Sequence, residues 1–241
     1  MNTEVITEGT LSKWESIPTK QRKEIKMSSP DMLGADAIKE KFPSMGPIGA
    51  GAQAHNTAVL HHNCTLGAGV VVGARASLGS FVVIGKDSVV YENARIARAV
   101  TVRNQCSIGE EAILHTDCVL RDHVRVSRRV VVGARSVVRQ GARILDRASL
   151  APYAVIAAGS EIGAGRQGVT RSVHLAGFNE WGVTGYLCDD GLIINIGCAN
   201  DYRGLPPDEM IERVVAKHGS GHSYVSMIML IEEWANGEGS R

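Results

Sequence analysis

The pattern of apolar positions along this chain has a period of six residues. From Ile48 to Ile162 every sixth residue is Ile, Leu or Val, with Ala54 as the single exception. Two positions before each of them stands a small side chain, which is Gly, Ala, Ser, Cys or Val throughout. No insertion shifts the phase over this stretch. A fixed short period of this kind predicts a stacked solenoid.

In such a solenoid each short strand points its aliphatic residue into a narrow interior, beside the small residue. Glycine often follows the aliphatic residue, as at Gly67, Gly85 and Gly109. We expect these glycines to supply a backbone conformation at a tight corner that a Cβ atom would disfavour. Three hexapeptides closing a triangular coil use 18 residues, so the repeat predicts between six and seven coils.

This pattern resembles the hexapeptide-repeat family, whose fold is the left-handed parallel β-helix. The resemblance implies the handedness, because the spacing alone says nothing about it and most parallel crossovers are right-handed. The expected fold class is therefore mainly β, a left-handed parallel β-helix of hexapeptide repeats with a small C-terminal α+β unit.

The chain divides into three expected parts: an N-terminal cap segment at 1–45, the β-helix at 46–168 and a C-terminal ββαα domain at 169–241. In the first part, Ser29 and Pro30 are expected to begin a short helix that Pro43 ends. Its role is either to cover the open end of the solenoid or to act as a lid or partner contact. The repeat loses its phase from residue 165 to residue 177, which predicts a linker.

After the linker, two strands are expected at 181–188 and 192–196, joined by a turn at Asp189-Asp190-Gly191. A helix is expected to begin near Pro206 and to end at Gly219. A second helix at 222–234 is apolar nearly all round, which predicts that it is buried.

Composition narrows the class of protein. Over 241 residues the formal net charge is +1, which argues against nucleic acid as a partner. The N-terminal residues lack an apolar signal region and no stretch approaches membrane-spanning length. Three of the five cysteines, Cys64, Cys106 and Cys118, occupy the inward small position of the repeat. We therefore expect a reduced, cytoplasmic protein without a membrane partner.

One segment carries a closer resemblance. Residues 60–67 read Leu-His-His-Asn-Cys-Thr-Leu-Gly. They are similar to the aliphatic-x-His-Asp/Glu-Cys-x-Ile-Gly segment of sugar O- and N-acetyltransferases of the sialic-acid and bacillosamine type. The resemblance implies that His62 is the catalytic general base and that Asn63 replaces the carboxylate that normally follows it. The alternative is that His62 is an exposed histidine in a repeat loop.

The same resemblance implies a cofactor and an assembly. Members of this family usually work as homotrimers, with acetyl-CoA or another acyl-CoA lying in the groove between neighbouring β-helices and a sugar-like hydroxyl or amine as acceptor. Residues 151–159 resemble the segment that closes many of these acyltransferases, although its final Pro-Ala is absent here. The alternative function is a non-enzymatic trimeric scaffold that presents the C-terminal domain.

Arginines recur at one position of successive coils. Arg103, Arg121 and Arg139 are spaced by 18 residues, with only Asp122 as a carboxylate close by in sequence. A stack of like charges needs solvent or an anion to be stable, so these arginines form either a solvated face or a site for an anion such as a CoA phosphate.

The histidines of this chain do not have the spacing of a zinc site known in this fold. The γ-class carbonic anhydrases bind zinc through three convergent histidines, the second of them two coils after the first. Two coils beyond His61 and His62 stand Ala97 and Arg98, and two coils beyond His115 stands Ala151. The sequence therefore predicts no metal site.

Overall fold

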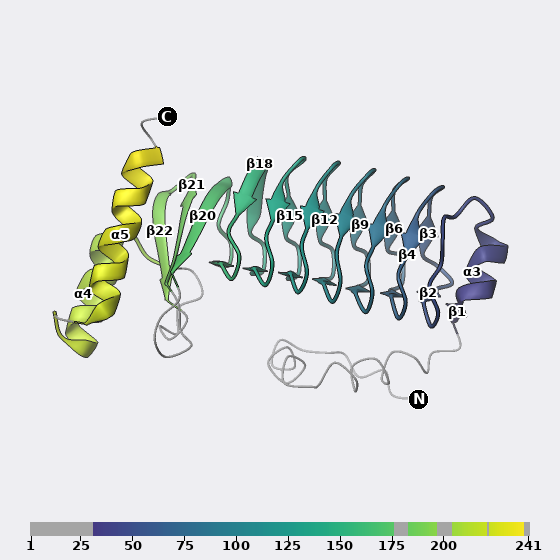
Figure 1. Ribbon diagram of the computed structural model, residues 1–241, viewed down its shortest axis with the longest axis horizontal. Coiled ribbons are helices and arrows are strands. Elements are labelled where there is room, and N and C mark those ends of the chain that lie inside the picture. The colour runs from purple at the N-terminus through teal and green to yellow at the C-terminus, as the bar shows by residue number, and fades with distance from the viewer. Residues whose placement is uncertain (1–30, 176–182, 197–203, 221, 239–241) are drawn as a thin grey trace.

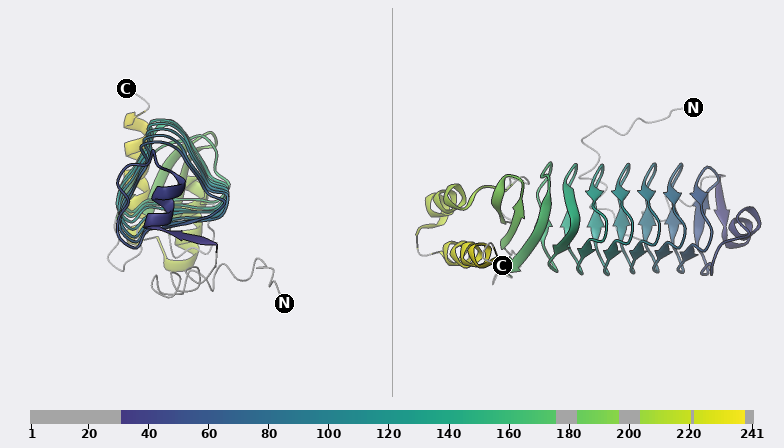
Figure 2. Two further views of the ribbon diagram at one scale, coloured as in Figure 1. Left: turned by 90° about the vertical axis from the view of Figure 1, so that its right-hand side faces the viewer. Right: turned by 90° about the horizontal axis from the view of Figure 1, so that it is seen from above.

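The computed structural model describes residues 31–175, 183–196, 204–220 and 222–238. The repeat forms a parallel β-solenoid of about seven turns, stacked along the long axis of the molecule (Figure 1). Viewed nearly down that axis, the coils superpose into a three-sided outline (Figure 2). The mainly β solenoid that the six-residue period predicts is thereby confirmed. In the part of the chain that the structure describes, no helix combines the length and apolar character needed to cross a membrane.

The solenoid has three faces, which we call A, B and C. Face A consists of β2 (Gln53–His55), β5 (Val71–Val72), β8 (Val89–Val90), β11 (Ser107–Ile108), β14 (Arg125–Val126), β17 (Arg143–Ile144) and β19 (Glu161–Ile162). Face B consists of β3 (Val59–Leu60), β6 (Ser77–Leu78), β9 (Arg95–Ile96), β12 (Ile113–Leu114), β15 (Val131–Val132) and the first part of β18 (Ser149–Ile156). Face C consists of β4 (Thr65–Leu66), β7 (Val83–Ile84), β10 (Thr101–Val102), β13 (Val119–Leu120), β16 (Val137–Val138) and the last part of β18.

The register between coils is 18 residues, as the three-hexapeptide coil requires. Thr101 pairs with Val119, for example, and Val102 pairs with Leu120. The second residue of each two-residue strand points inward, and from Ala54 to Ile162 every aliphatic residue of the repeat is at most 5% exposed. These side chains and the small residues beside them form one continuous core along the axis.

The glycines act differently from the expectation. At Gly109, an added Cβ atom would lie 2.4 Å from the carbonyl carbon of Ser127 in the next coil, and the backbone of Gly109 is not left-handed. Gly67 and Gly85 are blocked in the same way. The left-handed corner positions are mostly filled by other residues, such as Asn63 with φ 57° and Phe81 with φ 63°. Glycine therefore provides room for the neighbouring coil at these sites rather than a special φ.

The N-terminal end of the solenoid is covered. Strand β1 (Met32–Gly34) pairs antiparallel with β2, and α3 (Ala35–Lys41) buries Ile38 against the core. A short helix before Pro43 is therefore confirmed, but it begins after Gly34. The expected cap, Ser29, lies outside the described residues.

The first strand of the C-terminal part continues the parallel sheet of the solenoid, and the strands after it are antiparallel. Strand β20 (Val169–Leu175) pairs parallel with β18, so the predicted linker is wrong over these residues. Strands β21 (Val183–Cys188) and β22 (Gly191–Ile196) form the predicted hairpin and extend the sheet antiparallel.

Helices α4 (Pro207–His218) and α5 (Ser223–Glu238) close that end of the molecule (Figure 1). They pack on the hairpin around a second core that includes Val183, Met210 and Ile228. Helix α5 is not buried all round, because Met229 is 60% exposed and Leu230 is 57% exposed. The division of the chain into parts at 1–45, 46–168 and 169–241 stays a prediction.

Candidate functional site

His62 stands at the corner between faces B and C, two residues after the end of β3, with its side chain exposed. The Nδ1 atom of His62 lies 3.1 Å from the Oγ atom of Ser80, which occupies the same corner one coil further on. The backbone couples the same two coils, because the N–H of Phe81 donates a hydrogen bond to the carbonyl oxygen of His62 at 3.2 Å. The Nδ1 atom of His62 is thus held by Ser80, while its Nε2 atom has no hydrogen bond to a described residue.

An aromatic side chain packs against the imidazole. The rings of His62 and Phe81 meet edge to face, with centroids 5.3 Å apart. Beyond it, Cζ of Arg98 lies 5.4 Å from the centroid of the Phe81 ring. Phe81 is 45% exposed, so it offers an apolar surface beside the imidazole. Cation–π and edge-to-face contacts of this kind restrict the orientation of all three side chains.

Asn63 does not hold the imidazole in this structure. Its backbone N–H donates to the carbonyl oxygen of Ser44 at 2.8 Å, and its side chain makes no hydrogen bond to a described residue. Ser80, and not Asn63, lies at the Nδ1 atom of His62. The signal that could have found it is the coil length, because Ser80 lies 18 residues after His62.

The buried thiol groups of the solenoid core are poor nucleophiles. Burial raises the pKa of the Cys64 thiol, and its Sγ atom donates to the carbonyl oxygen of Gly79 at 3.0 Å. Burial also raises the pKa of Cys106 to about 11. Since the thiolate is the reactive form, these cysteines act as small core residues.

The arginine column lies at the opposite edge of face C. Arg103, Arg121 and Arg139 are exposed and directly follow β10, β13 and β16. With respect to the described residues, none of the three guanidinium groups has an ion pair or a side-chain hydrogen bond. Asp122 does not neutralise them, because its Oδ1 atom accepts from the backbone N–H and the Nδ2 atom of Asn104, both at 3.0 Å.

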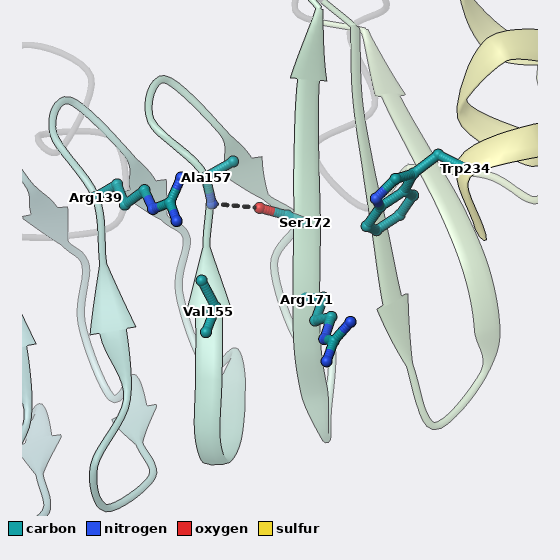
Figure 3. Close-up of a pocket in the computed structure, with 6 residues that line it drawn as sticks. All are labelled: Arg139, Val155, Ala157, Arg171, Ser172 and Trp234. Carbon is teal, nitrogen blue, oxygen red and sulfur yellow. Dashed lines mark hydrogen bonds between the residues drawn. The ribbon is translucent and has the colours of Figure 1, made fainter. Parts of the chain in front are cut away.

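A pocket opens where this column ends. It has a volume of about 280 Å³ and is lined by Arg139, Val155, Ala157, Arg171, Ser172 and Trp234 (Figure 3). Sequence reasoning singled out Arg139 but neither Arg171 nor Trp234. No periodicity relates a residue of α5 to the coils of the solenoid, so only the folded chain reveals their proximity.

No cluster of metal-binding side chains is present in the described ranges, where no group of three or more His, Cys, Asp or Glu residues is placed to share an ion. His218 and His222 have ring centroids 4.7 Å apart at the turn between α4 and α5. Two imidazoles without a third ligand are short of the sets that hold zinc in proteins.

The architecture is a hexapeptide-repeat solenoid. No family model matches the chain, and no curated protein matches it. Solved structures do match. A UDP-N-acetylglucosamine acyltransferase from Campylobacter jejuni is 14% identical, with a TM-score of 0.32, over 53% of this chain and 68% of that chain. The acetyltransferase domain of PglB from Neisseria gonorrhoeae is 18% identical, with a TM-score of 0.34, over 66% of this chain and 73% of that chain.

A third such structure is a hexapeptide transferase family protein from Anaplasma phagocytophilum. It is 19% identical, with a TM-score of 0.31, over 52% of this chain and 79% of that chain. These scores are too low to transfer an activity.

Proposed function

We propose that this protein transfers an acyl group, most simply acetyl, from acyl-CoA to a hydroxyl or amine of a sugar-like acceptor, in the cytoplasm and between the subunits of a homotrimer. The observation that carries the proposal is the contact between His62 and Ser80 at an exposed corner. A neutral imidazole can accept a proton from a reacting group, and histidine is the side chain that most often acts as a general base.

The reaction follows from the tautomer that this contact allows. With Nδ1 protonated and donating to the Oγ atom of Ser80, the Nε2 atom of His62 carries a lone pair. Nε2 takes the proton from the acceptor as its oxygen or nitrogen attacks the thioester carbonyl carbon. The tetrahedral intermediate collapses, the C–S bond breaks, and the departing sulfur takes the proton back from the imidazolium. Ser80 fixes the ring throughout but cannot stabilise the imidazolium as a carboxylate would.

The trimer is supported by the difference between the faces. The outward residues of face C are β-branched and mostly apolar: Thr65, Val83, Thr101, Val119, Val137 and Val155. Face A presents Arg125 and Arg143 instead. An apolar face on a long solenoid favours burial against another copy.

A closed ring of three uses heterologous contacts, so two different edges of the subunit meet in each interface. In the proposed trimer the His62 corner of one copy approaches the arginine column of the next. Within one chain these two edges lie on either side of face C, about 16 Å apart if the strand rises about 3.3 Å per residue. The assembly therefore brings a general base and an anion-binding column to one groove.

The experiment that tests the function is the release of free thiol from acetyl-CoA in the presence of a panel of amino sugars and nucleotide sugars. His62→Ala is expected to lower turnover by roughly two to four orders of magnitude. His61→Ala, an exposed neighbour on the same corner, is the matched control. Unchanged turnover in His62→Ala would remove the proposal.

The scaffold remains the second candidate, supported by the exposed Met229 and Leu230 on α5. A thermal-shift screen with acetyl-CoA and longer acyl-CoAs separates the two functions. A transferase is expected to gain stability that rises with the logarithm of the ligand concentration above Kd, whereas a scaffold would show no shift with any acyl-CoA.

A further inference from the structure

The arginine column is interrupted at its last coil. Arg103, Arg121 and Arg139 occupy one position of three successive coils, and Ala157 occupies that position in the next. The missing side chain leaves space above Arg139, and this space is the pocket of about 280 Å³ (Figure 3). The pocket is thus built by a change in the repeat rather than by a loop.

Its walls combine positive charge with an aromatic plane. Arg139 lies on the solenoid side, while Arg171 lies on β20, paired in register with Val155. Trp234 reaches toward the same space from α5, and part of its side chain packs against the second core (Figure 3). None of the lining residues is acidic. A ligand here meets guanidinium groups and the remaining face of an indole.

The floor of the pocket is fixed. The N–H of Ala157 donates to the Oγ atom of Ser172 at 2.9 Å, and this hydroxyl lies 2.8 Å from the Oγ atom of Ser160. Ser172 is 8% exposed and Ser160 is fully buried. These hydrogen bonds hold the last coil to β20, the strand that carries Arg171.

We infer that this pocket binds the phosphorylated nucleoside end of a ligand. Guanidinium groups bind phosphate oxygens with charge-assisted hydrogen bonds. An indole ring stacks on any nucleobase, because every base has a flat π-face. The volume lies near the lower limit of about 300 Å³ for small-molecule pockets, so it accommodates a base with its phosphate rather than a whole elongated ligand.

Two sources share this chemistry: the adenosine 3′-phosphate end of coenzyme A and the nucleotide of an activated sugar. The first rests on the proposed transferase function and agrees with the geometry. The pocket and the His62 corner are five coils apart along the axis, about 24 Å at about 4.8 Å per coil. Coenzyme A carries its nucleotide and its thioester at opposite ends of a long, thin arm, as a ligand joining these two places must.

The test is isothermal titration of the full-length protein with coenzyme A, adenosine 3′,5′-bisphosphate, UMP and inorganic phosphate. Arg139→Gln should weaken nucleotide binding about 10- to 100-fold, since it removes a charged hydrogen-bond donor. Trp234→Leu, which keeps apolar bulk but no flat ring, should weaken it about fivefold or more, and Trp234→Phe should retain most of the affinity. Arg95→Gln on face B and Met229→Ala on α5 are the matched controls, and both should bind as the unmodified protein does.

Preference for adenosine 3′,5′-bisphosphate over UMP would assign the pocket to coenzyme A, and the reverse would assign it to a nucleotide sugar. Inorganic phosphate binding as tightly as any nucleotide, or unchanged nucleotide binding in both Arg139→Gln and Trp234→Leu, would overturn the inference. The transferase proposal is tested by turnover and the pocket by titration. His62→Ala should lower turnover while nucleotide binding stays unchanged, so the two proposals can fail independently.

Discussion

Ser80 stands one coil beyond His62, and its hydroxyl oxygen lies 3.1 Å from the Nδ1 atom of the imidazole. If this contact orients the base, Ser80→Ala should lower kcat by up to about tenfold and leave KM unchanged, because a neutral hydrogen bond contributes about 0.5–1.5 kcal/mol. Steady-state kinetics measures both constants. Ser80→Thr, which keeps the hydroxyl, should restore most of the rate, and Ser77→Ala on the neighbouring strand is the control. A lowered kcat that Thr fails to rescue would point to a packing role instead.

Val119 lies on the outward side of β13, in the middle of face C. Val119→Lys places a charge in the proposed interface and should convert a trimer into a monomer. Light scattering at micromolar concentration measures the mass. Ser107→Lys on face A introduces the same charge outside the interface and should stay trimeric. A monomeric mass for the unmodified protein would contradict both the trimer and the intersubunit site.

Arg121 is the middle member of the arginine column. Arg121→Ala should weaken coenzyme A binding, and the loss should be larger at low salt than at high salt because screening weakens exposed charges. Titrations at two ionic strengths measure the difference, with Arg95→Ala as the control. An equal loss at both ionic strengths would show that the contact is not electrostatic.

Gly109 and Gly141 are glycines for different reasons. An added Cβ at Gly109 would lie 2.4 Å from the carbonyl carbon of Ser127, whereas Gly141 has φ +71° and open space around it. Gly109→Ala should therefore cost about 1–3 kcal/mol or more of unfolding free energy, because two coils would have to separate. Gly141→Asn should stay within about 0.5 kcal/mol, since asparagine tolerates the left-handed region. Denaturant unfolding measures both, and a neutral Gly109→Ala would show that adjacent coils are not rigidly spaced.

His174 lies at the joint between the solenoid and the C-terminal hairpin, with its Nδ1 atom 2.9 Å from the Oγ1 atom of Thr184. Burial lowers the pKa of His174 below its usual 6.5, and the charge of Glu161 opposes this only in part. The unfolded chain therefore takes up a proton more readily than the folded one, and stability should fall as the pH drops below about 6.5.

His174→Gln should reduce this loss of stability, by at most about 1.4 kcal/mol per pH unit. Thermal unfolding between about pH 7.5 and about pH 5.5 measures it. His123→Gln, at an exposed corner of the solenoid, is the control. Identical pH dependence in both variants would exclude His174 as the group responsible.

The solenoid was predictable because its core depends on local spacing alone. Leu114 and Ile144 are buried for the same reason as every other aliphatic residue of the repeat, and no long-range contact had to be known. The coil length also determines which residues are neighbours in adjacent coils, so Ser80 was within reach of the same reasoning.

The C-terminal part was less predictable. Strand β20 pairs with β18 without the six-residue pattern, because its outer neighbour is a hairpin rather than another coil. Helix α5 is apolar nearly all round, so its sequence does not reveal that Met229 and Leu230 lie on an exposed side. Trp234 lines the same pocket as Ala157 because α5 packs on the second core, and sequence periodicity has no bearing on that placement.

The solenoid contains no insertions, so the distance between its two ends depends only on the number of coils. Each coil of 18 residues adds one strand to every face and about 4.8 Å to the length of the solenoid. Duplication or loss of a single coil between them would leave the residues around His62 and the pocket beside Trp234 unchanged, but would change the distance between the two places. Under the proposed function, the number of coils therefore sets the length of the ligand that reaches from one site to the other, and this length can change without replacing any residue of either site.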